Sequence, residues 1–369
     1  MVGKRFPTSN IAPELVSKVG VIWRVSYNVP RRITIREVAA DAGLSISTVS
    51  RTLTGARAVT PDIAERVRES ADRLGYRADS IGRSLRTQRT NTLGLVIPYI
   101  TNPFFPALVK AIEHAARKHG LSVLIVDADN DPVVERAALR TLLDRRVDAV
   151  LISPAHATES LQALAETARL VPTIQIDRVI DTTLPWVRVN QSKPIGELVE
   201  RLRAGGRNHF AFVGQASTIA TSFERERAFT ALMSSALPEQ SLRVLQGTTS
   251  AASGAEAVRQ IMRDWPETDA IICANDMIAV GVVQGLRSSP QRVNVAVSGF
   301  DDTLIAEAMQ LTSVRQPIEA LASAALAAAS GEPGAAVQVE LFSTVIFRAS
   351  TLPLESGRDP GSGDTDPAG

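Results

Sequence analysis

Four side chains near the start of a short helical segment could contact DNA. They are Ile46, Ser47, Ser50 and Arg51. Small hydroxyl groups and a guanidinium near a helix N-terminus suit a helix that lies in the major groove. A surface helix without a partner can carry the same residues, so this segment alone leaves both interpretations open.

Two short helices separated by a glycine turn must position these side chains. Thr34 and Glu37 have the spacing of a capping box, which predicts the start of the first helix. Gly43 stands where a left-handed residue would end that helix, and Ser45 is a favoured N-cap for the second. We expect Val49 to face the interior of the helix pair.

A third helix completes a compact head over residues 33–77. Thr60 and Pro61 are residue types favoured at the N-cap and the first helical position, and Gly75 marks the end of the helix. Apolar residues recur between them at helical spacing and can form one core with Val38 and Val49. They are Ile63, Val67, Ala71 and Leu74.

The charge of the chain is distributed unevenly. The whole chain has a net charge of +1, yet residues 31–90 contain twelve arginines, no lysine and seven acidic residues, a net charge of +5. Residues 1–30 carry +3 and residues 91–369 carry −7. A basic head suits contact with a polyanion such as DNA, whereas the acidic remainder does not.

Residues 91–354 alternate between short apolar strands and helices. This alternation predicts an α/β fold with parallel sheets covered on both faces, in two lobes with a ligand cleft at the strand C-termini. The first series of expected strands is 93–98, 121–126, 147–153 and 172–177. The second series is 186–189, 209–213, 242–246, 270–274 and 294–298, and residues 337–347 give the last strands.

Three segments flank these two parts. Residues 78–90 form a basic linker with Ile81 and Leu85 on one face, too short and polar to be a stable helix alone. We expect it to fold only against a partner chain or DNA. Residues 1–32 show no clear pattern and are an N-terminal extension of unknown role. Residues 355–369, rich in Gly, Pro, Asp and Ser, are expected to form a disordered tail.

These motifs together resemble the lactose-repressor/galactose-repressor (LacI) family of bacterial transcription regulators, over about residues 33–351. The matching motifs of the head are Thr34-Ile-x-x-Val-Ala, Ala42-Gly-Leu-Ser, Thr48-Val-Ser-Arg-x-Leu53 and Leu74-Gly-Tyr. Those of the body are Asn102-Pro-Phe-Phe105, Ile176-Asp-Arg178, Arg225-x-x-Ala-Phe229, Ala274-Asn-Asp-Met-Ile-Ala279 and Ser298-Gly-Phe-Asp-Asp302. The resemblance implies a helix-turn-helix head, a hinge helix and a two-lobed body like that of periplasmic binding proteins.

The resemblance also implies roles in DNA binding. The residues at positions where the family reads base edges are Ile46, Ser47 and Arg51. Those where hydroxyl groups position the helix on phosphates are Ser45, Thr48 and Ser50. Leu85 matches the leucine that the family inserts into the minor groove, which kinks the duplex. One head reads a half-site, so a homodimer on a pseudo-palindromic, double-stranded operator is implied.

An effector pocket between the lobes is implied as well. Seven side chains fall at or near its expected positions: Phe104, Phe105, Asp127, Arg178, Lys193, Arg225 and Asp276. Sugars require this chemistry, because their hydroxyl groups need donors and acceptors and their C–H faces stack on rings. Lys193, together with the two arginines, raises the alternative of a sugar acid or phosphate. Simpler interpretations are a core position for the phenylalanines, a helix cap for Asp127 and a solvated position for Lys193.

The chain departs from the family pattern in places. Ala78 replaces the proline that begins the hinge, which loosens the entry to the hinge helix. Asn190-Gln191 stands where Asp-Asn is common, and Gly206-Arg207 replaces Gly-His. The helix at 318–330 is short for the family.

We interpret the chain as a transcriptional regulator, by family default a repressor, under allosteric control by a small effector. A sugar-binding protein of a transport system shares the two-lobed body, but the basic head and the lack of an export signal argue against it. No motif spacing indicates an enzyme, a cofactor or a metal site. The single cysteine, Cys273, and the lack of a membrane-spanning run favour the bacterial cytoplasm, in association with the nucleoid.

Overall fold

The computed structural model describes residues 33–54, 59–76, 89–236, 242–289, 294–331 and 338–352. It divides the chain into two compact units, Met1–Gly82 and Arg83–Gly369. Their described parts are called the head and the body. Residues 1–32, most of the predicted hinge with Ala78, Ile81 and Leu85, and the tail lie outside the described residues.

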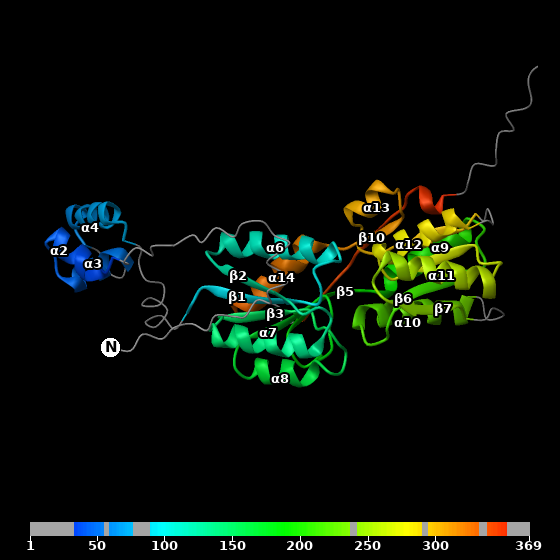
Figure 1. Cartoon of the computed structure of the whole chain (residues 1–369), viewed down its shortest axis with the longest axis horizontal. Coiled ribbons are helices and arrows are strands. Elements are labelled where there is room, and N and C mark those ends of the chain that lie inside the picture. The colour runs from blue at the N-terminus through cyan, green and yellow to red at the C-terminus, as the bar shows by residue number, and fades with distance from the viewer. Residues whose placement is uncertain are drawn as a thin grey trace, which may run out of the picture. The chain divides into compact units, whose positions relative to one another are not determined.

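The head is the predicted bundle of three helices: α2 (Ile35–Ala42), α3 (Ile46–Thr54) and α4 (Pro61–Leu74) (Figure 1). The Glu37 carboxylate accepts hydrogen bonds from the amide and the hydroxyl of Thr34, at 2.7 and 2.8 Å, and so caps α2. Gly43 ends that helix in the left-handed region at φ 62°. Val38, Val49 and Val67 form the buried centre of the head.

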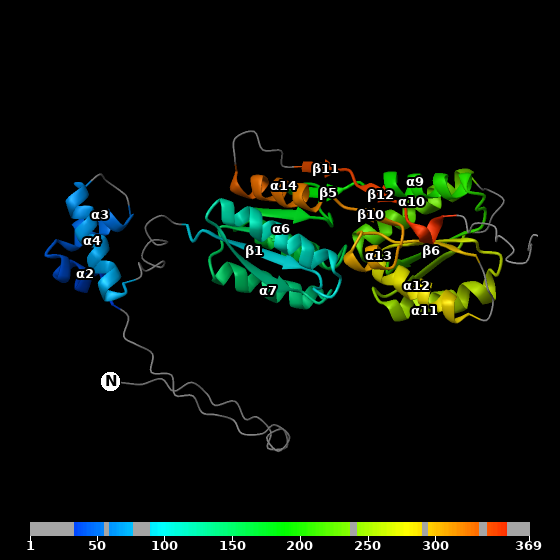
Figure 2. The same cartoon turned by 90° about the horizontal axis from the view of Figure 1, so that it is seen from above.

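One lobe of the body, lobe 1, is a parallel six-stranded sheet with helices on both faces. Its strand order is β11-β5-β4-β3-β1-β2. The strands are β1 (Thr92–Ile97), β2 (Ser122–Asp127), β3 (Ala149–Ile152), β4 (Thr173–Ile176), β5 (Trp186–Val189) and β11 (Gln338–Leu341). The helices are α6 (Phe104–Lys118), α7 (Pro132–Asp144), α8 (Leu161–Ala168) and α14 (Ile318–Ser330). Helices α6 and α14 pack together on one face, and α7 and α8 cover the other (Figures 1 and 2).

Lobe 2 has a parallel sheet of four strands in the order β7-β6-β8-β9. These strands are β6 (Phe210–Gln215), β7 (Val244–Gly247), β8 (Ala270–Cys273) and β9 (Ala296–Ser298). The helices are α9 (Ser192–Ala204), α10 (Ala220–Ala236), α11 (Ala251–Asp264), α12 (Asp276–Ser288) and α13 (Leu304–Ala308). An antiparallel pair, β10 (Ser313–Arg315) and β12 (Thr344–Ile346), and the 3-10 helix η1 (Ala349–Thr351) complete the lobe.

The two lobes with parallel sheets confirm the predicted α/β fold. The assignment of strands to the two lobes differs from the prediction. Strand β5 was expected to open the second series, and it pairs instead with β4 in lobe 1. The expected strand region 337–347 is two strands in different sheets, because β11 pairs with β5 and β12 pairs with β10. The chain therefore crosses between the lobes after β5, after β10 and after β11. Helix α13 and strand β10 were missed, since both are very short.

Two helices of lobe 2, α11 and α12, pack in unusually close contact. A methyl group added at Gly281 would stand 1.8 Å from the carbonyl oxygen of Ala251, and one at Gly254 would stand 2.1 Å from that of Ile278. Backbone atoms cannot rotate away as a side chain can. Glycine is therefore required at both positions for the helices to approach this closely.

We expect Gly281→Ala to destabilise the body by about 1–3 kcal/mol, because the helices must move apart. The matched control is Gly196→Ala on α9, where no atom lies near an added methyl group. That change should be neutral or stabilise by about 0.5–1 kcal/mol, as alanine favours a helix over glycine. Urea unfolding measures both free energies, and equal stability of the two variants would contradict the packing argument.

Candidate functional site

The predicted DNA-reading residues lie on the outer surface of α3 and on the turn before it. Ile46 is 46% exposed. Ser47 and Arg51 are exposed beside it, and the Arg51 Nε donates to the carbonyl oxygen of Ser47 at 3.0 Å. This bond aligns the arginine along the exposed face of α3.

Two of the hydroxyl groups predicted to contact phosphates, those of Ser45 and Thr48, lie at the N-terminus of α3, and Ser50 lies in its second turn. The Ser45 and Thr48 hydroxyl groups lie 2.8 Å apart, and the Ser45 Oγ accepts from the Thr48 amide at 3.2 Å. Ser45 therefore caps α3 as predicted. Thr48 and Ser50 are half-buried. The positive end of the helix dipole lies at this terminus and favours a phosphate there.

The body contains a small cavity at the C-terminal ends of its strands, where a cleft was predicted. Its volume is about 20 Å³. Lobe 1 contributes Tyr99, Asn102, Phe104, Phe105, Asp177 and Arg178. The other lining residues are Gln215, Thr221, Arg225, Asn275, Asp301 and Gln316. The volume is close to that of one water molecule, so in this conformation the cavity has no room for a larger molecule.

Direct hydrogen bonds join the lobes around this cavity. The Asn102 Nδ2 of lobe 1 donates to the Asp301 Oδ2 of lobe 2 at 3.3 Å. The backbone amide of Ala157 donates to the carbonyl oxygen of Thr218 at 2.8 Å. Any opening of the cleft must break or stretch these two contacts.

Of the seven side chains predicted for the effector pocket, four line the cavity. Phe104 and Phe105 make an edge-to-face pair with ring centroids 5.1 Å apart. The Arg178 Nη1 donates to Asn130 and to the carbonyl oxygen of Pro154, both at 3.2 Å. The Arg225 guanidinium lies 3.4 Å from the centroid of the Phe300 ring.

The other three predicted side chains, Asp127, Lys193 and Asp276, do not line the cavity. Asp127 accepts from the backbone amides of Ile100 and Asp129, at 3.0 and 3.1 Å, and so holds two loops. The Lys193 ammonium lies 5.0 Å from the centroid of the Phe342 ring.

Asp276 is buried behind the cavity. Its carboxylate accepts from the Thr303 amide at 2.7 Å and from the Ser313 hydroxyl at 2.6 Å. Burial raises its pKa to about 7. Both carboxylate oxygens are thus engaged by the protein itself.

Two carboxylates that were not predicted, those of Asp177 and Asp301, line the cavity. Asp177 follows β4 and Asp301 follows β9, and both adopt positive φ, 67° and 106°. Strained backbone of this kind is concentrated at functional sites. Both lie in motifs quoted above, and acidic residues directly after parallel strands were the signal that could have identified them.

Three buried polar atoms of the cavity wall have no hydrogen-bond partner within the described residues. They are the Asp177 Oδ1, the Arg178 Nε and the Gln316 Oε1. Leaving such groups unpaired costs about 1–3 kcal/mol each. A ligand that supplies both donors and acceptors would recover this free energy.

The Asp301 carboxyl should make stability depend on pH. Burial raises its pKa to about 6, from an ordinary value of 3.8, against the attraction of Arg225. Between about pH 4 and pH 6 the folded protein retains a proton that the unfolded chain has lost, so Asp301 lowers stability as the pH rises.

We therefore expect the melting temperature of Asp301→Asn, relative to the wild type, to increase from pH 4 to pH 7. The corresponding gain in the free energy of unfolding is on the order of a few kcal/mol, since one pKa unit corresponds to about 1.4 kcal/mol. Thermal unfolding of both proteins across this range measures it. Parallel curves would show that Asp301 titrates normally.

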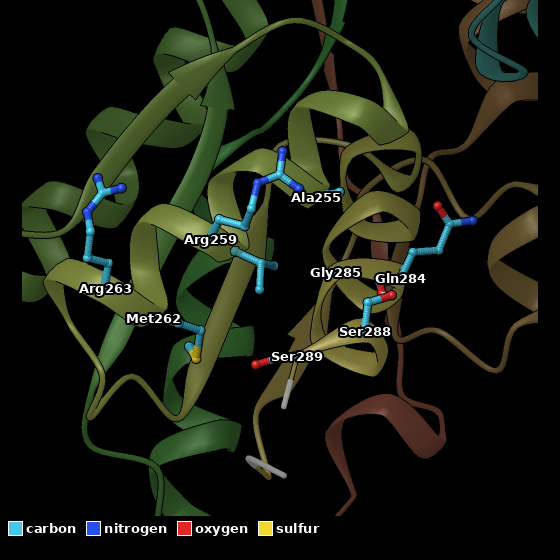
Figure 3. Close-up of a pocket in the computed structure, with 9 residues that line it drawn as sticks. Ala255, Arg259, Met262, Arg263, Gln284, Gly285, Ser288 and Ser289 are labelled. Carbon is cyan, nitrogen blue, oxygen red and sulfur yellow. The ribbon is translucent and has the colours of Figure 1, made fainter. Parts of the chain in front are cut away.

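A separate groove lies between α11 and α12 (Figure 3). Its volume is about 660 Å³, and Arg259, Met262 and Gln284 are among the residues that line it. It shares no residue with the cavity between the lobes. Within the described residues no helix could span a membrane, and no cluster of His, Cys, Asp and Glu could hold a metal ion.

The fold and these sites define a two-part protein, with a helix-turn-helix head and a two-lobed ligand-binding body. A family model for "bacterial regulatory proteins, lacI family" matches residues 34–79. A second, "periplasmic binding proteins and sugar binding domain of LacI family", matches residues 90–327. The chain belongs to the LacI family: it is a DNA-binding transcriptional regulator with a sugar-binding domain, in a family of regulators rather than enzymes.

Individual relatives agree with this assignment. Catabolite control protein A of Priestia megaterium is 28% identical over 302 residues, which span 80% of this chain and 90% of the relative. The ribose operon repressor of Halalkalibacterium halodurans is 28% identical over 291 residues, 77% of this chain and 86% of the relative.

Solved structures share the fold. The Lac repressor dimer bound to operator and the anti-inducer ONPF has a TM-score of 0.79 at 22% identity, covering 88% of this chain and all of that one. The transcriptional regulator CelR in complex with cellobiose has a TM-score of 0.63 at 26% identity, covering 86% of this chain and all of that one.

Proposed function

We propose that this regulator represses transcription by binding a pseudo-palindromic operator as a homodimer, and that a small sugar or sugar derivative changes its operator affinity. One observation carries the proposal. The chain combines two features: a head whose exposed α3 face carries side chains suited to DNA, and a cavity lined by four charged residues. These residues are Asp177, Arg178, Arg225 and Asp301.

In the proposed complex α3 lies in the major groove. Ile46, Ser47 and Arg51 read base edges, and Ser45, Thr48 and Ser50 position the helix on phosphates. Leu85, outside the described residues, is assigned the minor-groove wedge by resemblance alone. The operator's two half-sites match the two heads of a dimer.

The charges of the cavity favour an uncharged sugar over a sugar acid. Arg178 and Arg225 are balanced by Asp177 and Asp301 in the same wall. The unpartnered Asp177 and Gln316 oxygens require donors, which a hydroxyl group supplies and a carboxylate does not. Lys193, the cation that suggested an acid, lies over Phe342 instead.

Two relatives support a sugar by their own descriptions, one as a ribose operon repressor and one in complex with cellobiose. Phe104 and Phe105 would supply apolar contacts to the sugar ring. For Asp127 and Lys193 we propose effector contact only in a conformation with a more open cleft. For Asp276 we propose effector contact only when its hydrogen bonds to Thr303 and Ser313 are exchanged for bonds to the effector.

A homodimer is supported by the edge of lobe 1. Among the described residues β2 is an edge strand, paired with β1 alone, and its Ile125 is exposed. Exposed apolar edge strands are commonly covered by a partner. The bacterial cytoplasm, with association with the nucleoid, is the location that this function requires.

Operator binding by the full-length protein tests the proposal. Fluorescence anisotropy with palindromes from upstream of neighbouring genes should give an affinity that falls about 10³–10⁵-fold between 50 and 200 mM salt, if six to ten phosphates are contacted. Addition of D-ribose, cellobiose or D-gluconate identifies the effector class. A flat salt profile, or sugar binding without any DNA binding, would favour the transport-protein alternative.

A further inference from the structure

Gln191 is a buried side chain at the crossover from β5 to α9, and both ends of its amide make hydrogen bonds. Its Nε2 donates to the carbonyl oxygen of Val189 at 2.9 Å. Its Oε1 accepts from the Nε of Arg225 at 2.7 Å. Turning the amide over would set donor against donor and acceptor against acceptor. These partners therefore fix one orientation of the amide.

Within the part of the chain that the structure describes, Arg225 makes one further hydrogen bond and one ring contact, and both involve lobe 2. Its Nη1 donates to the carbonyl oxygen of Ala274, and its guanidinium lies over the Phe300 ring. Of the hydrogen bonds that Arg225 makes to described residues, only the one to Gln191 comes from the segment that arrives from lobe 1. Asp177 of lobe 1 acts on Arg225 through its charge alone. A movement of one lobe relative to the other should therefore alter the hydrogen bond between Gln191 and Arg225.

The crossover is itself tied to neighbouring elements. Arg188 and Glu340 are paired in the register of β5 and β11, and the Arg188 Nε lies 3.0 Å from the Glu340 Oε1. The Asn190 Nδ2 donates to the other Glu340 oxygen at 3.1 Å. The Arg188 Nη1 lies 3.6 Å from the Glu224 Oε1 on α10, the helix that carries Arg225.

A polar cavity of about 360 Å³ lies beside these groups, with Gln191, Arg188 and Glu224 in its wall. It gives the side chains of the crossover room to change position, and it admits water if one of them is shortened. Gln191 thus both lines this cavity and bonds to Arg225.

We propose that Gln191 is a positioning residue that makes the direction of the Arg225 guanidinium depend on the geometry of the β5–α9 crossover. When the lobes rotate about this crossover, Gln191 moves with Val189, and its hydrogen bond to Arg225 turns or breaks. The inference rests on the proposed function only in assigning Arg225 to effector contact.

The first test needs no effector. Full-length protein with ¹⁵N-labelled arginine reports the Arg225 Nε–H, assigned by its loss in Arg225→Lys. In Gln191→Leu, which removes the acceptor at similar volume, hydrogen exchange of this group should be about tenfold faster, as expected for one lost hydrogen bond. In Gln191→Glu, which retains an acceptor, exchange should stay near the wild-type rate.

The matched control is Gln162→Leu on α8, an exposed glutamine whose Nε2 donates to Glu166 at 2.8 Å. It should leave the Arg225 signal unchanged. If Gln191→Leu does not fold, Gln191→Asn replaces it, because the shorter side chain also withdraws the acceptor. Unchanged exchange in the variant that lacks the acceptor would overturn the proposal, as would equal acceleration in Gln191→Glu.

The second test measures the consequence for ligand binding. Calorimetry with D-ribose, cellobiose and D-gluconate should show the sugar bound by the wild type weakened about tenfold in Gln191→Leu, with operator affinity in its absence unchanged. Wild-type affinity in Gln191→Leu would overturn the link to the effector. If no sugar binds the wild type, the effector assignment fails, while the exchange experiment still decides the role of Gln191.

Discussion

Arg51→Ala should remove most sequence-specific operator binding and leave non-specific DNA binding nearly intact. An arginine that binds a guanine edge contributes about 1–3 kcal/mol of discrimination, and a dimer loses this contribution twice. We expect operator affinity to fall about a hundredfold or more. Anisotropy with the operator and with a scrambled duplex of equal length separates the two kinds of binding.

Arg68→Ala is the matched control, because Arg68 is an exposed arginine of the same head on α4 rather than α3. It removes the same charge and should weaken both kinds of binding equally and modestly through the loss of long-range attraction. The head should remain folded in both variants, since neither side chain belongs to the core. Equal losses for operator and scrambled DNA in Arg51→Ala would reject its base-reading role.

Arg225→Ala should abolish the response to effector while operator binding persists. Arg225 is buried in the cavity wall, and the removal of a charged hydrogen-bond donor from such a site costs about 2–5 kcal/mol. We expect sugar affinity to fall about a hundredfold or more. Release of the operator by increasing sugar concentration, followed by anisotropy, measures the response.

Stability must be recorded beside this response, because Arg225 also offsets the charges of Asp177 and Asp301. Arg117→Ala is the control, an exposed arginine on α6 paired with Glu113. It should leave both the sugar response and the melting temperature unchanged. Operator release from Arg225→Ala at the wild-type sugar concentration would remove Arg225 from the proposed effector site.

Most of the fold could be predicted because its signals are local. The spacing of Thr34, Glu37 and Gly43 specifies a helix and its end, since a capping box and a left-handed residue act within one turn. Strand β5 begins and ends where the sequence predicted. The sheet that β5 joins could not be predicted, because strand pairing depends on contacts between segments distant in the chain.

The candidate site divides in the same way. Phe104, Phe105, Arg178 and Arg225 were found by position in a motif. Asp276 was chosen by the same reasoning, yet its two oxygens are taken by Thr303 and Ser313, which only the folded loops bring near. Asp301 lies at the cavity instead. Its Oδ1 accepts a hydrogen bond of 2.7 Å from the Nε2 of Gln316, which belongs to the crossover after β10.

The sequence by itself determined the parts of this protein: a basic helix-turn-helix head, a two-lobed α/β body and the family to which both belong. Local capping, hydrophobic period and motif spacing were sufficient for that. The tertiary structure decided which side chains share the cleft and that Gln191 lies against Arg225, 34 residues further along the chain. Such neighbours are created by the chain crossing three times between two lobes, and no local pattern of residues encodes the distances that result.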